Sequence, residues 1–583
     1  SLEAEVKEEG QAESDHEPKE RPPLHTTGSL VGVGSNRVGR CTMARWLSWE
    51  FLLIWYVIMA YFFTQVVPQG CMRLLALCES DVYCLGFMRP SLWRANYEMD
   101  NGDIQWREFR CEIHLLSLAA AAYVVLRAAF GRRRTWPCLM LSLAFVGYLH
   151  GGHTIFLLVA CSGSYAVARA FGASKWAPVA AWAYGLSLIG FKVLNMQLKL
   201  AWVLGPVGKS LDNLPRAYDW HQSLSLMVLR LISFNMDYYW ALKAVEGGAP
   251  QHEVPATADS EALTYKLRER RPRPVADYSL ANCIAHAFYA PLWLAGPTMS
   301  FNVFASHLRD REQEAVRGWR LLLYGFRLVV CLALLEFVLH VAPVFALGRS
   351  KAYERLLRGD GEADLAALYV FMILNVMWLK FLVIWRFARL WALCDGFECI
   401  ENMQRCVCNN YSIIGFWKGW HVSFNRWLVR YLYVPLGGRK WRWANVWLVF
   451  GFVAIWHDAE VKLLAWGMLN AGFLAMEHLA GSFWQSRTLA PLRARPELAR
   501  WVRCAAGTTY IYVMLFVNLV GYGIGVGGSL SVTGAAFFGN AGQGLKTLLG
   551  SYIILFSGVQ VMLELRACGI SRDAGDEEPI KAT

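Results

Sequence analysis

The chain has 583 residues, of which 56% are hydrophobic and only 17% are charged. A soluble domain carries about 25% charged residues, so this composition excludes an ordinary soluble protein and indicates a polytopic integral membrane protein. The formal net charge is +12, but the sequence has no zinc-knuckle, RNA-recognition or basic-zipper pattern, and we expect no nucleic-acid partner. Basic residues in cytosol-facing loops, near anionic lipid, account for the charge.

The chain begins with a polar segment. Residues 1–45 are rich in Glu, Gly and Ser and have too little apolar surface to offset the entropy of ordering, so we expect a disordered tail. The first apolar segment, Trp46–Val67, has full membrane length and no small-residue cleavage site after it, which predicts a retained span. We expect one transmembrane domain over residues 46–567 and a polar C-terminal tail at 568–583.

Further apolar segments recur along this domain. They lie roughly at 113–130, 136–150, 154–171, 176–194, 221–242, 279–297, 320–347, 366–394, 445–457, 462–480, 505–526 and 547–565. They predict an all-α fold, a polytopic transmembrane helical bundle of about 11–13 membrane segments, including re-entrant ones where Gly and Pro interrupt the helix. Irregular backbone at membrane depth is stable only where protein or a water-filled cavity surrounds it, so the bundle is expected to enclose a chamber.

Charged loops predict the orientation of the chain in the membrane. Basic residues precede the first span, and a second basic loop lies at 266–273, which places the N-terminus and this loop in the cytosol. The chain has 15 cysteines, and those within apolar segments are expected to pack as small hydrophobic residues. Cys78 and Cys84, after the first span, can pair if their loop is lumenal; the sequence leaves this open.

Polar side chains interrupt an aromatic stretch, "GFWKGWHVSFNRWLVRYLYVPLGG", at residues 415–438. On a continuous helix, His421 and Asn425 share one face, and Arg426 and Arg430 form a second pair beside it. Charges in the hydrocarbon core are costly and normally face the bundle interior or the interface. Two interpretations stay open: an interfacial amphipathic helix whose arginines meet lipid phosphates, or part of a buried reaction site.

A second histidine lies downstream, in "FVAIWHDAE". His457 follows the almost wholly apolar run Ala444–Trp456. A lone histidine in an apolar helix is commonly a core residue with satisfied hydrogen bonds, but two histidines and an asparagine on neighbouring segments favour a reaction site. Neutral imidazole can take a proton from a hydroxyl. A second polar group can then bind a carbonyl oxygen whose negative charge grows in the transition state.

These stretches resemble the signature of the membrane-bound O-acyltransferase superfamily, and most closely its glycerol uptake protein (Gup) branch, which is related to hedgehog acyltransferase. The resemblance extends to "SFNMDYYWA" at 233–241, "FYAPLWLAGPTMSFN" at 288–302 and "WRFARLWALCDGFECIENMQRCVCNNYS" at 385–412. It implies that His457 is the catalytic histidine and that His421 occupies the upstream polar position. Asn425 matches a position that is asparagine or histidine elsewhere in the superfamily, and residues 46–567 are then the catalytic domain.

The resemblance implies acyl transfer from acyl-CoA to an acceptor hydroxyl. His457 would act as general base, while His421 and Asn425 orient the acceptor or polarise the thioester carbonyl. Three cationic side chains are candidates to bind the phosphates of CoA or of a phospholipid, or alternatively to have a structural role at the membrane interface: Lys418, Arg426 and Arg430. Aromatic side chains are candidates to contact substrate: Trp420, Trp427 and Tyr431. Cys406 falls where hedgehog-branch relatives have a cysteine that can ligate haem, so haem is a further expectation, and the sequence has no other metal motif.

For the Gup branch, the resemblance implies re-acylation of a lysolipid during remodelling of glycosylphosphatidylinositol (GPI) anchors in the endoplasmic reticulum membrane. The expected partners are membrane lipids, acyl-CoA and a lysophospholipid or GPI-anchor acceptor. The alternatives are a protein acyltransferase of the hedgehog-acyltransferase type and a glycerol transporter. His421 replaces the aspartate of the protein-palmitoylating branch, which counts against a protein amine as acceptor. The absence of an internal sequence repeat counts against an inverted-repeat transporter.

Overall fold

The computed structural model describes residues 48–91, 98–132, 134–247, 265–309, 316, 318–357, 362–539 and 541–568. The predicted N-terminal tail, residues 1–45, lies outside the described residues, and so does the predicted C-terminal tail beyond residue 568.

Helices make up most of the described chain, as the apolar segments predict. The helices of the first half are α2 (Tyr56–Tyr61), α3 (Val67–Glu79), α4 (Val82–Leu85), α5 (Ile104–Phe130), α6 (Thr135–His150), α7 (Thr154–Phe171), α8 (Ala177–Val193), α9 (Ala201–Asp212), α10 (Trp220–Glu246), α11 (Tyr265–Arg270), α12 (Leu280–Ala287) and α13 (Phe301–Arg309). Those of the second half are α14 (Trp319–Val341), α15 (Val344–Ser350), α16 (Ala363–Cys394), α17 (Ile413–Gly419), α18 (Val422–Leu428), α19 (Arg442–His457), α20 (Val461–Trp484), α21 (Ala490–Arg493), α22 (Pro496–Asn518), α23 (Gly525–Gly534) and α24 (Ala541–Ala567).

Short π and 3₁₀ turns interrupt or connect these helices. The π turns are η1 (Phe51–Trp55), η2 (Phe62–Val66), η7 (Val429–Tyr433), η10 (Leu519–Gly523) and η11 (Ala535–Gly539). The 3₁₀ turns are η3 (Gly151–His153), η4 (Val275–Asp277), η5 (Ala290–Leu292), η6 (Ala352–Leu357), η8 (Gly438–Trp441) and η9 (Arg487–Leu489). Two of the π turns, η7 and η10, lie next to the candidate site, where such turns are frequently found.

Several helical segments are long and apolar enough to cross a membrane. Within the described residues there are seven: Phe51–Glu79, Ile104–Phe130, Thr135–Phe171, Trp319–Val341, Ala363–Cys394, Pro496–Gly523 and Gly542–Ala567. The 37 residues of Thr135–Phe171 would span about 55 Å as one straight helix, against a hydrocarbon core of about 30 Å. Gly151, with a φ of 57°, divides this segment into α6 and α7. The protein is a multi-pass helical membrane protein.

The remaining predicted segments are shorter or more polar. α8 has 17 residues and α19 has 16. The predicted span at 279–297 is helical only as far as Ala287, where α12 ends, and continues through a single 3₁₀ turn. Such a segment fits the expected re-entrant type, and the total of about 11–13 membrane segments stays a prediction.

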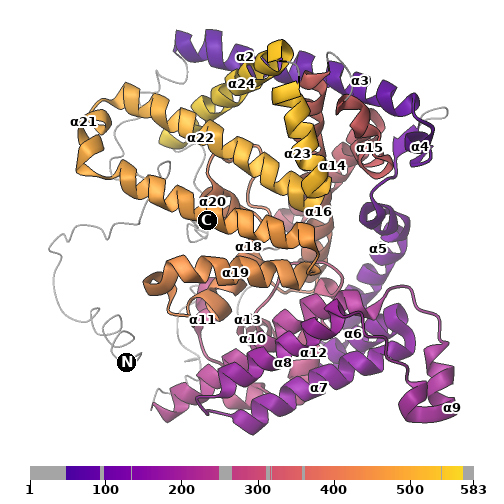
Figure 1. Cartoon of the computed structure of the whole chain (residues 1–583). Coiled ribbons are helices and arrows are strands. Elements are labelled where there is room, and N and C mark those ends of the chain that lie inside the picture. The colour runs from indigo at the N-terminus through magenta and orange to yellow at the C-terminus, as the bar shows by residue number, and fades with distance from the viewer. Residues whose placement is uncertain are drawn as a thin grey trace.

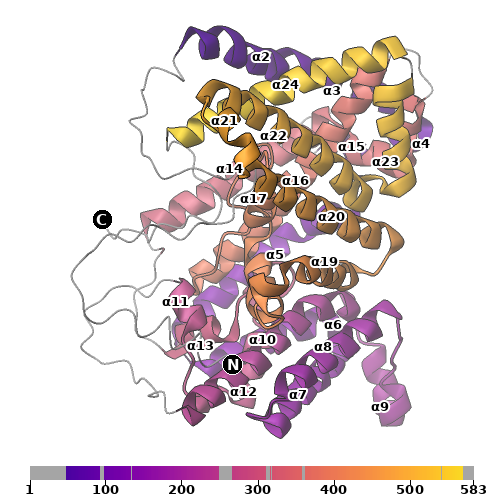
Figure 2. The ribbon, with the colours of Figure 1, turned by 60° about the vertical axis from the view of Figure 1, so that its left-hand side comes forward.

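The helices form two groups that meet around α16 (Figure 1). One group contains α6, α7, α8, α10 and α12, which pack on one another. The other contains α14, α20, α22 and α24, and the N-terminal helix α2 packs beside α24. Helix α19 lies between the two groups in both views (Figures 1 and 2), and Figure 1 places α18 beside it. The two stretches that carry the candidate histidines are therefore central in the molecule.

One side of the molecule carries a small hairpin and a disulfide. Strand β1 (Met88–Pro90) pairs antiparallel with β2 (Glu98–Asp100). Cys78 and Cys84, whose pairing the sequence left open, form a disulfide with their Cα atoms 5.2 Å apart. Figures 1 and 2 both place α4, which contains Cys84, on the opposite side of the molecule from α11.

An aromatic core surrounds the central helices. Phe424 and Trp427 from α18, Trp456 from α19 and Trp466 from α20 are all buried in it, together with apolar residues of α8 and α10. Large rigid rings bury much apolar area at little entropic cost. This packing holds α18, α19 and α20 in fixed positions relative to α10.

Candidate active site

His421 lies in a break between two short helices. α17 ends at Gly419 and α18 begins at Val422, and His421 has a φ of 46°, in the left-handed region that few non-glycine residues adopt. The next turn is fixed by Asn402, whose backbone oxygen accepts a hydrogen bond from the Val422 N–H (3.1 Å). The Asn402 side-chain oxygen accepts a second one from the Ser423 hydroxyl (2.6 Å). These contacts stabilise the strained backbone at His421.

This break shows that the prediction of one continuous helix is wrong at His421. The residue precedes α18, so it does not share a helix face with Asn425. Its imidazole instead stacks on the indole of Trp385 from α16, with ring centroids 4.4 Å apart and planes at 11°. Within the described residues, no hydrogen bond is made by the ring of His421 or by the side-chain amide of Asn425. Both half-buried groups are therefore available to a substrate.

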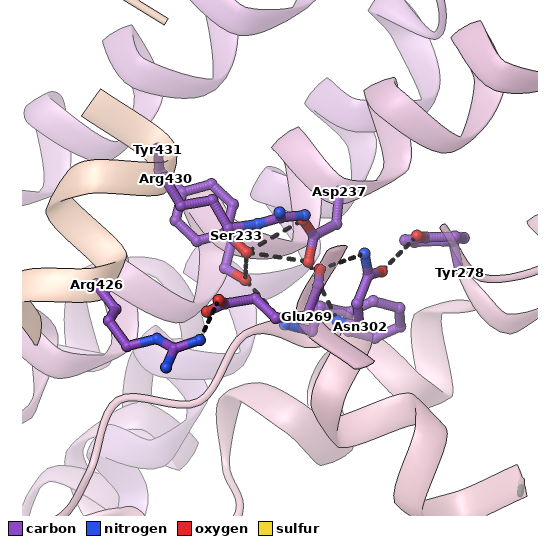
Figure 3. A network of polar contacts seen from close by, with 9 residues as sticks. Ser233, Asp237, Glu269, Tyr278, Asn302, Arg426, Arg430 and Tyr431 are labelled. Atoms are coloured by element: carbon purple, nitrogen blue, oxygen red, sulfur yellow. Dashed lines mark hydrogen bonds and ion pairs between the residues drawn. The ribbon is translucent and has the colours of Figure 1, made fainter. Parts of the chain in front are cut away.

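Acidic side chains from distant parts of the chain hold the two arginines of this segment (Figure 3). Arg426 on α18 forms an ion pair with Glu269 on α11 (3.1 Å), and Arg430 in η7 pairs with Asp237 on α10 (2.9 Å). Asp237 is completely buried, where a lone carboxylate would be very costly. The contact with substrate phosphates predicted for these arginines stays a prediction, and the ion pairs give both residues a structural role.

Three further groups complete this network (Figure 3). The Tyr431 hydroxyl lies 3.1 Å from each oxygen of Asp237 and accepts a hydrogen bond from the Ser233 hydroxyl (3.0 Å). The Asn302 backbone N–H donates to Asp237 (3.1 Å). The network thus ties η7 to α10 and α13, and it fixes the position of the segment that follows His421.

The three aromatic residues predicted to contact substrate lie in different surroundings. Trp427 is buried and donates its indole N–H to a backbone oxygen of α10 (2.9 Å), and Tyr431 is buried in the network. Trp420 is half-buried, directly precedes His421 and stacks on Phe416 with centroids 5.5 Å apart. Substrate contact stays a prediction for all three, and Trp420 is the one beside the free imidazole.

His457 is the last residue of α19. Lys192, from α8, donates a hydrogen bond to its backbone oxygen (2.9 Å) and pairs with the Asp458 carboxylate (3.0 Å). A cation at this end of a helix satisfies a terminal carbonyl and complements the helix dipole. On the ring side, Nε2 of His457 lies 3.0 Å from the hydroxyl of Tyr522 in η10. Both the backbone and the ring of His457 are therefore held.

Stacked rings connect the two histidines. Phe424 lies 5.1 Å from the ring of His421 and stacks on Trp456 at 4.4 Å, and Trp456 directly precedes His457. The two imidazoles are close enough to interact electrostatically. Asn425 lies one helical turn after the break and donates its backbone N–H to the His421 carbonyl (3.0 Å). The three predicted catalytic residues thus lie in one region, between α16, α18 and α19.

A basic cluster lies at the opposite end of α19. Its members are Lys418, Arg439, Lys440 and Arg442, and among the described residues none of the four has an ion-pair partner. Lys418 and Arg442 both lie near His478 of α20, so they belong to one surface although 24 residues separate them in the sequence. An anionic group can bind here without displacing an existing ion pair.

Cys406 lies in the segment between α16 and α17. Its thiol is exposed, and the thiol of Cys408 donates a hydrogen bond to Asn375 (2.8 Å). Contact with the neighbouring Cys408 lowers the pKa of Cys406 to about 7, which favours its thiolate form. Within the described part of the chain, no cluster of three or more His, Cys, Asp or Glu residues could hold a metal ion. Haem needs only one such axial ligand from the protein, and Cys406 fits that requirement.

Other histidines in apolar segments have structural hydrogen bonds. His150 contacts the Tyr218 carbonyl (2.9 Å), His286 the Met299 carbonyl (3.0 Å) and His340 the Ser91 hydroxyl (2.7 Å). These contacts give the three histidines structural roles. They distinguish these three side chains from the free ring of His421.

Sequence reasoning missed three residues of this region. Asp237 and Lys192 are isolated charges in largely apolar helices, which is a signal for a buried partner, but their partners lie 193 and 265 residues away. Tyr522 gave no signal, because it is one of 24 tyrosines in the chain.

Sequence comparison with known proteins shows the family to which the chain belongs. Residues 217–520 match the membrane-bound O-acyltransferase (MBOAT) family. The chain is 34% identical over 494 residues to "Membrane-bound O-acyltransferase gup1" of Schizosaccharomyces pombe, which covers 82% of each protein. It is 33% identical over 489 residues to "Membrane-bound O-acyltransferase GUP1" of Saccharomyces cerevisiae, covering 81% of this chain and 83% of the relative.

A more distant similarity is confined to part of the chain. The protein is 27% identical over 201 residues to "Protein-cysteine N-palmitoyltransferase HHAT" of Mus musculus, which covers 33% of this chain and 39% of the relative. The family match includes His421, Asn425 and His457. On these grounds the chain belongs to the membrane-bound O-acyltransferase family and is an O-acyltransferase.

Proposed function

We propose that the protein transfers a fatty acyl chain from acyl-CoA to a lipid hydroxyl, and that it re-acylates a lysolipid during GPI-anchor remodelling in the endoplasmic reticulum membrane. The observation that carries the proposal is the gathering of three polar residues in the apolar centre of the molecule. His457 is held by Lys192 of α8 and Tyr522 of η10, whereas the side chains of His421 and Asn425 have no hydrogen-bond partner within the described residues. This is the arrangement of a fixed base beside free binding groups.

His457 would start the reaction as general base. It takes the proton of the acceptor hydroxyl while the hydroxyl oxygen attacks the thioester carbonyl carbon. The C–S bond of the tetrahedral intermediate then breaks, which yields the ester and the CoA thiolate. The thiolate takes the proton from the imidazolium of His457, which restores the neutral base. Such assistance contributes about 10²–10⁴-fold.

His421 and Asn425 would bind the oxygen on which negative charge develops. The Asn425 amide and a ring N–H of His421 are both hydrogen-bond donors. Removing one oxyanion donor costs about 10²–10³ in turnover. Stacking on Trp385 fixes the plane of the His421 ring, so the donor needs little reorganisation when charge appears.

The basic cluster supports acyl-CoA as donor. α19 has 16 residues and is therefore about 24 Å long, with Arg439, Lys440 and Arg442 at its start and His457 at its end. The phosphates of CoA would bind at the basic start, while the acyl-pantetheine arm runs along the helix to the base. The chain reaches the start of α19 directly after the segment whose Arg426 pairs with Glu269 of α11. Because α11 belongs to the loop predicted to be cytosolic, the basic start of α19 is expected on the cytosolic side, where CoA is found.

Three observations support an oxidising compartment such as the endoplasmic reticulum and a hydroxyl acceptor. The Cys78–Cys84 disulfide forms in oxidising compartments, which suits a lumenal loop on the side away from α11. The relatives that cover most of the chain carry the name membrane-bound O-acyltransferase gup1 or GUP1. His421 stands where the protein-palmitoylating branch is expected to have aspartate, which favours a hydroxyl acceptor.

The similarity to a protein-cysteine N-palmitoyltransferase makes a protein acyltransferase the second candidate. A glycerol transporter needs neither a paired nor a fixed histidine, so the geometry gives it no support. Cys406 is the residue that would hold a haem, through its thiolate, in the segment between α16 and α17. The acyl-transfer steps proposed here do not use it.

Release of the CoA thiol by purified protein distinguishes the two acceptor classes. The protein is supplied with a mixed acyl-CoA pool and either lysophosphatidylinositol or an N-terminal peptide of a secreted protein. We expect release that depends on the lysolipid and a new ester in the lipid product. Release that depends on the peptide would instead assign the protein acyltransferase activity. Proteoliposomes that take up glycerol but release no thiol would contradict the proposed enzyme function.

A further inference from the structure

Within the described residues, the ring of His457 has one hydrogen-bond partner, the Tyr522 hydroxyl, which lies 3.0 Å from Nε2. Tyr522 belongs to η10, the π turn that follows α22. The turn is pressed against Trp466, because a Cβ placed on Gly521 would lie only 2.6 Å from the indole. Trp466 in turn meets the ring of Tyr522 edge-on, with centroids 5.2 Å apart. The hydroxyl is therefore held in position by packing and is not a chance surface contact.

Neutral imidazole carries a proton on one nitrogen and a lone pair on the other. If Tyr522 donated its proton to Nε2, it would occupy the lone pair that a general base needs. The bond is compatible with base catalysis when Nε2–H donates to the tyrosine oxygen, which leaves the lone pair on Nδ1. Within the described residues, Nδ1 of His457 has no hydrogen-bond partner.

We propose that Tyr522 is the positioning residue of the active site, and that its oxygen accepts the Nε2–H of His457 so that Nδ1 faces the acceptor hydroxyl. This inference rests on the proposed role of His457 as base. In the reaction, Nδ1 receives the proton of the acceptor hydroxyl, so both ring nitrogens then carry protons. The hydrogen bond from Nε2–H to the Tyr522 oxygen persists throughout. The proton on Nδ1 then passes to the departing CoA thiolate. Tyr522 itself touches neither substrate.

The backbone contact completes this positioning. Lys192 also donates to the Ser225 hydroxyl (2.8 Å), in addition to its bonds to the His457 carbonyl and to Asp458. The last turn of α19 is thus fixed from α8 and α10, while the ring is oriented from η10. Because two separate elements fix the backbone and the ring, loss of the Tyr522 hydroxyl is expected to affect ring orientation without unfolding α19.

Tyr522→Phe removes the hydroxyl and keeps the ring. The matched control is Tyr512→Phe on α22, whose hydroxyl bonds Ser551 (2.6 Å) away from the histidines. We expect Tyr522→Phe to lower kcat about tenfold, the equivalent of one hydrogen bond, with an unchanged KM for acyl-CoA. Tyr512→Phe is expected to leave both constants as in wild type. If Tyr522→Phe does not accumulate, Tyr522→Gln and Tyr522→Leu replace it, and Gln, which retains a hydrogen-bonding group, is expected to be about tenfold more active than Leu.

Modification of His457 by diethyl pyrocarbonate, mapped by mass spectrometry, is the second readout, and it needs no substrate. Loss of the partner of Nε2 is expected to raise the modification rate of His457 in Tyr522→Phe and not in Tyr512→Phe. Equal rates together with unchanged kcat would overturn the inference. A failure of the proposed function can be distinguished from a failure of this inference. If His457 is not the base, a His457→Ala variant would keep wild-type turnover, whatever the result for Tyr522→Phe.

Discussion

Replacing Asp237 by alanine tests whether the buried network holds the histidine segment. The carboxylate has no exposed surface and receives hydrogen bonds from Arg430, Tyr431 and the Asn302 backbone. Its loss leaves the guanidinium of Arg430, whose side chain is only 18% exposed, without a counter-charge. Removing one partner of a buried ion pair costs about 3–5 kcal/mol. We expect this loss in the free energy of unfolding, measured by SDS titration in mixed micelles with tryptophan fluorescence.

The matched control is Asp364→Ala, which breaks the ion pair with Arg73. That pair is shorter, at 2.6 Å, but its side chains are 61% and 43% exposed, and exposed pairs contribute about 0–1 kcal/mol. The Asp237→Ala/Arg430→Ala double variant is expected to cost less than the sum of the single variants, because they share one interaction. Equal losses for Asp237→Ala and Asp364→Ala, or strict additivity in the double variant, would refute the reasoning.

Two further predictions concern the ends of the site. The double variant Arg439→Gln/Lys440→Gln is expected to raise the KM for acyl-CoA and to weaken the dependence of this KM on ionic strength, since two charges that attract the CoA phosphates are lost. Initial rates at two salt concentrations check this prediction. An unchanged KM would mean that the phosphates bind elsewhere. If Cys406 holds a haem, Cys406→Ala is expected to abolish the Soret absorbance of the purified protein, whereas Cys408→Ala retains it because the Cys406 thiolate remains. Equal absorbance in both variants would contradict ligation by Cys406.

Much of the architecture follows from local sequence patterns. Runs of apolar residues at membrane length predicted the helical, multi-pass fold, and the isolated His457 was correctly placed at the end of an apolar helix. The span predicted at 279–297 ends early, at Ala287, and the Pro and Gly residues that follow it are local signals of this end. Each of these features depends on residues close together in the chain.

The parts that escaped prediction depend on distant contacts. The backbone break at His421 is stabilised by Asn402, in a segment without regular structure, so helical spacing gave the wrong geometry there. Arg426 and Arg430 were read as possible phosphate ligands, because Glu269 and Asp237 lie 157 and 193 residues away from them. Spacing within one segment cannot reveal such partners.

The most direct test of the account is CoA-thiol release by His457→Ala in the presence of acyl-CoA and lysophosphatidylinositol. His340→Ala is the matched control, since this histidine is bound to Ser91, outside the candidate site. We expect turnover of His457→Ala to fall by about 10²–10⁴-fold, while His340→Ala retains it. Wild-type turnover in His457→Ala would contradict the assignment of His457 as the catalytic base.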